Sequence, residues 1–138
     1  MILVMSTHAT AVFEIKTWDE KPYQEIEGGS KLTRASVTKA YRGDITGDAT
    51  SESLMFYRAD GSAVFAGLER VVGAIGGRAG SFVLRVSGTY RDGTATCDCA
   101  VVPDSGSGEL RGLRGEGRYV ATHVDYPNVP FTLDYSFD

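Results

Sequence analysis

The sequence predicts an all-β domain in which eight antiparallel strands close into an up-and-down barrel. Two observations carry this prediction. Apolar and polar side chains alternate in many short runs, and no long stretch shows the apolar period of a helix. Turn signals such as Asp60-Gly61 and Asp92-Gly93 separate the runs and favour tight hairpins. Consecutive hairpins form a meander, and closing the meander removes two edges that invite aggregation. A two-sheet sandwich is the structural alternative.

The predicted strands follow one another with few interruptions. The first, residues 8–18, precedes a polar stretch with Pro22 and Gly28-Gly29 that we interpret as a long loop. The Gly/Ser segment 104–108 is interpreted as a turn rather than a phosphate-binding loop, because no Gly-Lys-Ser/Thr motif follows it. The other seven strands are expected at about residues 31–42, 49–58, 62–74, 80–90, 94–102, 115–124 and 131–137.

The fourth predicted strand is apolar on both faces. Phe65 and Val71 lie on one side, whereas Val64, Leu68 and Val72 lie on the other. Both faces of such a strand are expected to be buried, one against the core of the domain and the other against a second surface. A subunit interface is the simplest such surface. We therefore expect a homo-oligomer.

Composition limits the partners. The chain has 138 residues and a net charge of −4, and its arginines are scattered rather than clustered, so neither nucleic acid nor a membrane surface is an expected partner. The apolar run at residues 1–5 is too short for an export signal or a membrane span. We interpret residues 1–7 as a disordered leader, residues 8–138 as one domain, and the protein as cytoplasmic.

The two cysteines, Cys97 and Cys99, point to the same side of one predicted strand. No second Cys/His pair accompanies them, so we interpret them as small buried side chains rather than metal ligands. We expect neither a metal nor an organic cofactor.

Two ionisable residues are candidate catalytic groups. Glu69 shares a face with Phe65 and Val71, where desolvation would raise the carboxyl pKa and favour acid/base chemistry. The alternative is a structural ion pair, for example with an arginine of a neighbouring strand. His123 shares a face with Tyr119 near the end of the seventh strand; it is either a base at the barrel rim or a solvated strand-end residue.

Aromatic side chains supply candidate substrate-binding positions. Apolar walls with a few phenols suit a ligand of moderate size, although tyrosine also packs structurally in many proteins. Glu14 and Trp18 share the more polar face of the first strand and are expected to face outward, with Trp18 capping a barrel end or lying in an interface. The candidate binding residues are Tyr41, Tyr57, Phe65, Tyr90, Tyr119 and Tyr135.

Several segments carry a family resemblance. Residues 11–20, 31–37, 67–71, 80–84 and 106–117 resemble the bacterial domain-of-unknown-function family 3224, over nearly the whole chain. That family in turn resembles the allene oxide cyclase-like barrels, which include the plant dirigent proteins. The resemblance implies an eight-stranded barrel with a central cavity, a homo-oligomer, and cyclisation or coupling chemistry without a cofactor. It implies no catalytic residue.

Three functions remain open at this stage. The first is a cofactor-independent cyclase or isomerase acting on an apolar small molecule, with Glu69 as its acid or base. The second is a non-catalytic barrel that binds a small ligand. The third is a structural module whose fourth strand serves oligomerisation.

Overall fold

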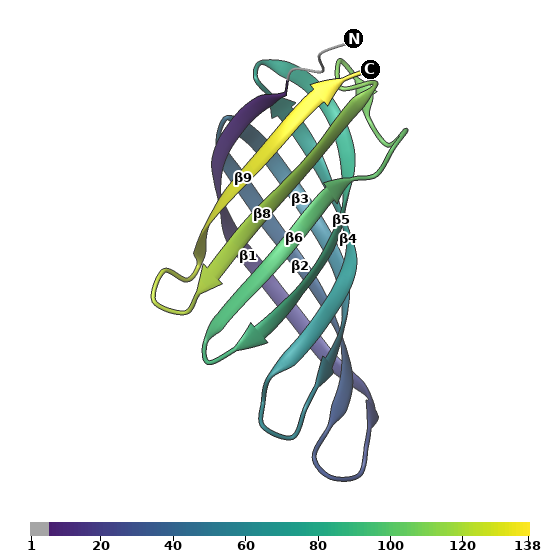
Figure 1. The fold of residues 1–138 in the computed structure, drawn as a ribbon, viewed down its shortest axis with the longest axis vertical. Coiled ribbons are helices and arrows are strands. Elements are labelled where there is room, and N and C mark those ends of the chain that lie inside the picture. Colours follow the sequence, from purple (N-terminus) through teal and green to yellow (C-terminus); the bar gives the residue numbers. More distant parts are fainter. Residues whose placement is uncertain (1–5) are drawn as a thin grey trace.

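The computed structural model describes residues 6–138 as a closed antiparallel barrel without a helix (Figure 1). Eight strands are long, and β7 contains only two residues. The strands are β1 (Thr7–Glu25), β2 (Lys31–Gly43), β3 (Ile45–Tyr57), β4 (Ala63–Ile75), β5 (Arg78–Arg91), β6 (Thr94–Val101), β7 (Ser107–Gly108), β8 (Leu113–Thr122) and β9 (Asn128–Phe137).

Closure follows from the order of the long strands. Each pairs with its sequence neighbour, β8 pairs with β6, and β1 pairs with β9. The additional β4–β5 pairing joins the two ends of the sheet order, so no long strand is left as an edge. The predicted up-and-down barrel is confirmed, and the two-sheet sandwich is excluded.

Alternate residues of the strands point inward, and at one end of the barrel large buried side chains form a tightly packed core. This packed end holds both termini and the β2–β3 and β4–β5 turns (Figure 1). The connection after β6 folds across it and inserts Leu110, which is fully buried. Large side chains with almost no exposed surface fill this end: Ile45, Ile75, Phe82, Leu110, Leu113 and Leu133.

The first strand differs from its prediction in length. Residues 19–25, interpreted as part of a loop, continue β1 and pair with β2 as far as Glu25 opposite Lys31. The polar composition was misleading, because this hairpin extends beyond the other turns and both its faces meet water (Figure 1). Pro22 is accommodated beside a register shift between Pro22 and Gln24.

A β-bulge changes the direction of Trp18. Ile15 pairs with Lys39 and Thr17 pairs with Thr38, so Lys16 is an extra residue on β1. Beyond the bulge the alternation shifts by one position. The expectation that Trp18 faces outward with Glu14 is therefore wrong: Trp18 pairs with inward-facing Val37 and turns toward the interior.

Other boundaries differ less. The segment interpreted as a Gly/Ser turn contains β7, which pairs with Gly80 and Ser81 of β5. β3 begins at Ile45 rather than near residue 49, and β8 ends at Thr122. The predicted leader, residues 1–7, lies mostly outside the described residues, although β1 begins at Thr7. Within residues 6–138 no helix is long and apolar enough to cross a membrane.

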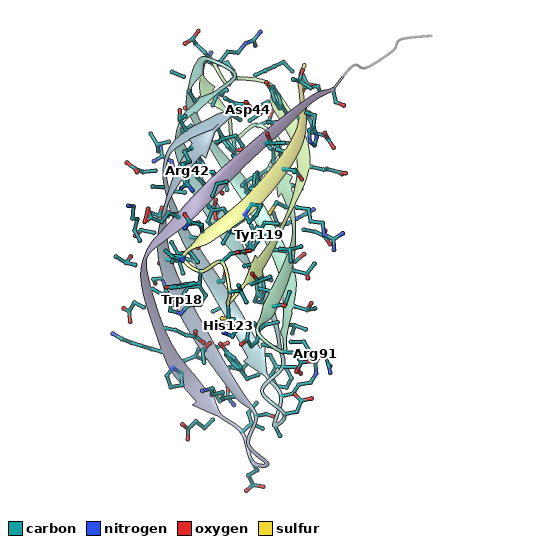
Figure 2. All side chains as sticks on the ribbon, turned by 90° about the vertical axis from the view of Figure 1, so that its left-hand side faces the viewer. Trp18, Arg42, Asp44, Arg91, Tyr119 and His123 are labelled. Carbon is teal, nitrogen blue, oxygen red and sulfur yellow. The ribbon has the colours of Figure 1, made fainter. Side chains whose placement is uncertain are left out.

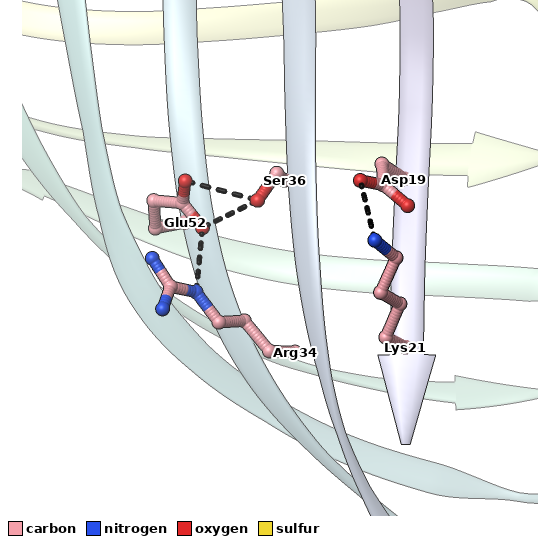
Figure 3. Close-up of polar contacts among 5 residues, drawn as sticks. All are labelled: Asp19, Lys21, Arg34, Ser36 and Glu52. Atoms are coloured by element: carbon pink, nitrogen blue, oxygen red, sulfur yellow. Dashed lines mark hydrogen bonds and ion pairs between the residues drawn. The ribbon is translucent and has the colours of Figure 1, made fainter. Parts of the chain in front are cut away.

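The outer face of the β2–β3–β4 wall is divided between charged and apolar side chains. Glu52 accepts hydrogen bonds from Ser36 and from Arg34, whose Nε lies 3.1 Å from Oε2 (Figure 3). On β4, by contrast, Leu68 and Val72 are each about half exposed. The second, apolar face predicted for the fourth strand is present on the outside of the barrel.

Candidate functional site

The end opposite the packed end contains a cavity of about 380 Å³. Its mouth lies at the hairpin end of the barrel. This end is formed by the β1–β2, β3–β4, β5–β6 and β8–β9 hairpins (Figure 1). The space exists because three inward positions there carry only a methyl group: Ala35, Ala95 and Ala121. Six aromatic side chains form much of the wall: Phe13, Trp18, Tyr57, Phe65, Tyr90 and Tyr119.

Lys39 brings a positive charge into this apolar cavity. Its side chain projects inward from β2 and is only 7% exposed. The Nζ lies 4.1 Å from the ring centroid of Phe13 and 5.1 Å from that of Tyr119, distances at which aromatic faces attract a cation. The cavity therefore has an aromatic wall and a hydrogen-bond donor at its inner end.

Glu69 lies beneath Lys39, on the side away from the mouth. Its Oε1 lies 2.5 Å from Lys39 Nζ, and its Oε2 accepts a hydrogen bond from the Tyr41 hydroxyl at 2.5 Å. The carboxylate is almost completely buried, and both its oxygens are occupied, so it does not line the cavity. Burial, reinforced by the neighbouring Glu69, raises the pKa of Tyr41 well above its usual value, so Tyr41 remains a neutral donor.

A second cluster of polar side chains lies near the mouth, with Glu20 at its centre. Trp18 Nε1 donates to Glu20 Oε1 at 3.0 Å, and the hydroxyls of Thr33 and Tyr57 both donate to Oε2 at 2.7 Å. Burial, together with the hydrogen bond to Glu20, raises the pKa of Tyr57. These contacts hold the Trp18 ring at the entrance, where it is half exposed (Figure 2).

Two serines add hydroxyls to one wall. Ser51 and Ser53 both point inward from β3 and line the cavity. Ser51 pairs across strands with Val37 on one side and Glu69 on the other. Lys39, Ser51 and Glu69 therefore occupy neighbouring positions on β2, β3 and β4.

One glycine shapes the aromatic wall. A Cβ added to Gly88 would lie 2.6 Å from the tip of the Phe65 ring. A methyl group at this position would collide with the ring and with the β6 backbone, so glycine leaves the room that the Phe65 ring occupies.

The structure separates the predicted site residues into three groups. Tyr57, Phe65, Tyr90 and Tyr119 line the cavity. Tyr41 and Glu69 lie beneath its inner end. The remaining two are elsewhere: Tyr135 packs against Phe137 at the packed end, and His123 is exposed in the turn after β8 (Figure 2).

Three residues of the candidate site were not predicted from the sequence: Lys39, Glu20 and Trp18. For Lys39 a signal was present, since it shares the inward face of β2 with Val37 and Tyr41. For Glu20 and Trp18 no comparable signal existed, because the bulge at Lys16 sets their direction. The alternative considered for Glu69, a structural ion pair, is present, and its partner is Lys39 rather than the arginine given as an example.

The two cysteines lie on β6, where Cys97 pairs with Tyr119 of β8. Cys97 and Cys99 are free and buried, with their sulfurs 3.9 Å apart. The hydrogen bond to Cys97, together with burial, raises the pKa of Cys99. No cluster of three or more possible metal ligands occurs within residues 6–138. The burial predicted for the two cysteine side chains is confirmed.

The chain belongs to a protein family of unknown function. Residues 9–135 match the family described as "Protein of unknown function (DUF3224)". A crystal structure of a DUF3224 protein of unknown function from Shewanella oneidensis MR-1 is similar to this chain. The two share 31% identity and a TM-score of 0.79, covering 96% of this chain and 98% of the other.

No curated protein is similar to the chain. The family and its barrel are thus established, and family membership confirms that part of the sequence prediction. The resemblance to allene oxide cyclase-like barrels stays a prediction, as do the homo-oligomer and the cytoplasmic location.

Proposed function

We propose that this protein binds a small, largely apolar molecule in the cavity at the hairpin end of the barrel. The supporting observation is a space of about 380 Å³ with aromatic walls and the buried Lys39 ammonium at its inner end. A cavity of this size departs from the close packing of protein interiors, and apolar pockets with few polar groups are typical of ligand sites. The ligand would stack on the rings and accept a hydrogen bond from Lys39.

The single tryptophan of the chain provides a direct test, because Trp18 lies at the cavity mouth. The probe is prodan, a neutral naphthyl ketone dye whose absorption overlaps tryptophan emission. Titration should quench Trp18 by energy transfer and shift the dye emission to the blue, with a dissociation constant on the order of micromolar.

Two variants of neighbouring β8 residues make a matched pair. Ala121→Phe places a ring inside the cavity and should abolish dye binding. Val120→Phe introduces the same ring on the outer face, where Val120 is 40% exposed, and should leave binding unchanged. Equal binding by both variants would mean that the dye occupies another place, and the proposed cavity function would then be wrong.

Cofactor-independent isomerisation or cyclisation is a second candidate function. Lys39 favours it, because a buried ammonium that donates to a ligand carbonyl also acidifies the neighbouring C–H bonds, whose proton would pass to solvent water at the cavity mouth. Glu69 would act on the ligand only through Lys39, since it does not line the cavity. Deuterium incorporation into the methyl group of bound acetylnaphthalene, followed by NMR in heavy water, tests this chemistry. Exchange no faster than in protein-free buffer would exclude it for this ligand.

Self-association is a third candidate, supported by the outer face of β4. Leu68 is 55% exposed, Val72 48%, and Val64 36%, and Leu54 of β3 beside them is 54% exposed. Contiguous apolar side chains of this kind commonly mark interfaces. Light scattering should report an oligomer for the wild type and a smaller species for Leu68→Glu; a monomeric wild type would exclude this function.

A further inference from the structure

We infer that the cavity selects electrically neutral ligands that carry a hydrogen-bond acceptor, such as aromatic ketones and aldehydes, over carboxylates. This inference rests on the proposed binding function and names the ligand class. It follows from how the charges around the cavity are already balanced and from where unused donors remain.

The charge of Lys39 is already neutralised. Glu69 lies 2.5 Å from its Nζ, and the two side chains are 7% and 1% exposed. A ligand carboxylate docked on Lys39 would place two anions around one cation in a site with little water to screen them. A neutral acceptor gains the hydrogen bond from the ammonium without that repulsion.

A donor remains available on Lys39. The ammonium carries three N–H bonds, and Glu69 accepts one of them. The Phe13 and Tyr119 rings cover part of the remaining surface of Nζ, and the rest faces the cavity. One donor is therefore directed toward the space that a ligand would fill.

A second potential donor is Ser51, on the strand next to that of Lys39. Ser51 is the diagonal neighbour of Lys39, because Lys39 pairs with Ala49, two residues before Ser51. The hydroxyl lines the cavity. A carbonyl oxygen has two lone pairs and can accept from both groups, whereas a hydrocarbon would leave both donors unused.

The entrance also disfavours anions. Glu20 faces inward near the mouth and receives its hydrogen bonds from the neutral groups of Trp18, Thr33 and Tyr57. Lys31 lies nearby, with its Nζ 5.2 Å from the Tyr57 ring centroid, and offsets part of this charge. An anionic ligand would pass one carboxylate and then approach a second, Glu69.

Three near-isosteric ligands, substituted at the same ring carbon, test the inference: ethylnaphthalene, acetylnaphthalene and naphthoate. Calorimetric titration of the wild type near neutral pH should show acetylnaphthalene binding at least about tenfold more tightly than naphthoate. It should also bind severalfold more tightly than ethylnaphthalene, which cannot accept a hydrogen bond.

Glu69→Gln removes the balancing charge while keeping the shape. In this variant the affinity for naphthoate should rise by about tenfold or more. The preference for acetylnaphthalene over naphthoate should therefore become smaller or reverse. Ser51→Ala is the second variant, which keeps the experiment informative if Glu69→Gln does not fold. It should weaken acetylnaphthalene severalfold and leave ethylnaphthalene unchanged.

The outcomes separate this inference from the proposed function. Naphthoate binding as tightly as acetylnaphthalene to the wild type would overturn the neutral-ligand assignment and leave cavity binding intact. An unchanged preference in a folded Glu69→Gln protein would overturn the role given to charge balance. Failure of all three ligands to bind would count against the proposed function itself.

Discussion

The two ends of the barrel share the same eight long strands, yet one is solid and the other is hollow. At the packed end, inward positions carry large branched or aromatic side chains such as Phe82 and Leu133, and Leu110 closes the opening. At the hairpin end, Ala35 and Ala95 occupy equivalent inward positions, and a cavity remains. Side-chain volume, rather than strand number, therefore decides where an eight-stranded barrel has room for a ligand.

Between the two ends lies a layer formed by Lys39, Glu69 and Tyr41. Lys39 and Tyr41 both donate hydrogen bonds to Glu69. Within residues 6–138 no buried side-chain nitrogen or oxygen lacks a hydrogen-bond partner. A buried ion pair of this kind is weak evidence for stability, because desolvation offsets the attraction. We therefore attribute the pair to the proposed ligand site, where Lys39 would offer its remaining hydrogen-bond donor to the cavity.

Matched phenylalanine truncations should show the largest difference between the ends. Phe82→Ala, at the packed end, should lower the free energy of unfolding by about 3–5 kcal/mol, because a cavity opens where the ring is fully buried. Phe65→Ala should cost only about 1–2 kcal/mol, because that ring already borders open space and is partly exposed. Urea unfolding of both variants measures the comparison, and equal losses would contradict it.

Breaking the central ion pair should also be costly. Lys39→Met leaves Glu69 buried without its cation and should lower the free energy of unfolding by about 3 kcal/mol. The double variant Lys39→Met/Glu69→Gln removes both charges and should regain most of that loss, while ketone binding remains weak. If the double variant were no more stable than the single one, the pair would not be the source of the effect.

Enlarging an inward-facing alanine should change the free energy of unfolding in opposite directions at the two ends of the barrel. Ala95→Val adds two methyl groups beside open space on a strand and should raise the free energy of unfolding by about 0.5–1 kcal/mol, while weakening ligand binding. Ala9→Val adds the same volume to a position that is 1% exposed at the packed end and should lower stability by about 1–3 kcal/mol. Thermal unfolding of the two variants measures both stability changes. Changes in the same direction would contradict the predicted difference between the two ends.

Raising the pH should produce the smallest of these effects on stability. The free energy of unfolding should change little near neutral pH and should fall once the pH exceeds about 10. Burial raises the pKa of Tyr41 and Tyr119 in the barrel, whereas tyrosine in the unfolded chain titrates near about pH 10. Above that pH the unfolded chain binds fewer protons than the folded chain, so the free energy of unfolding falls as pH rises.

Ultraviolet absorbance of tyrosinate, measured together with circular dichroism, tests this titration. Phenolate from Tyr41 and Tyr119 should appear only as the barrel unfolds, and Tyr41→Phe should remove one phenolate from that step. Complete titration of all seven tyrosines before unfolding would contradict it.

Alternation along the strands made much of the site predictable. Tyr57, Phe65, Tyr90 and Tyr119 were expected to face a pocket, and all four line the cavity. Tyr135 has the same character but lies at the packed end, because local sequence does not report depth along the barrel axis. Lys39 was missed, although it falls between two inward residues of its strand, since a charged residue is not expected inside without its partner in view.

The sequence by itself determined the period-two pattern, the hairpin turns and therefore the class of fold, because these depend on neighbouring residues and on local backbone preferences. Only the tertiary structure decided that Glu69 meets Lys39 rather than an arginine, and that the extra residue Lys16 turns Trp18 inward. It also decided which end remains hollow. These features depend on strand register and on contacts between residues distant in sequence, where a shift of one residue exchanges the inside and the outside.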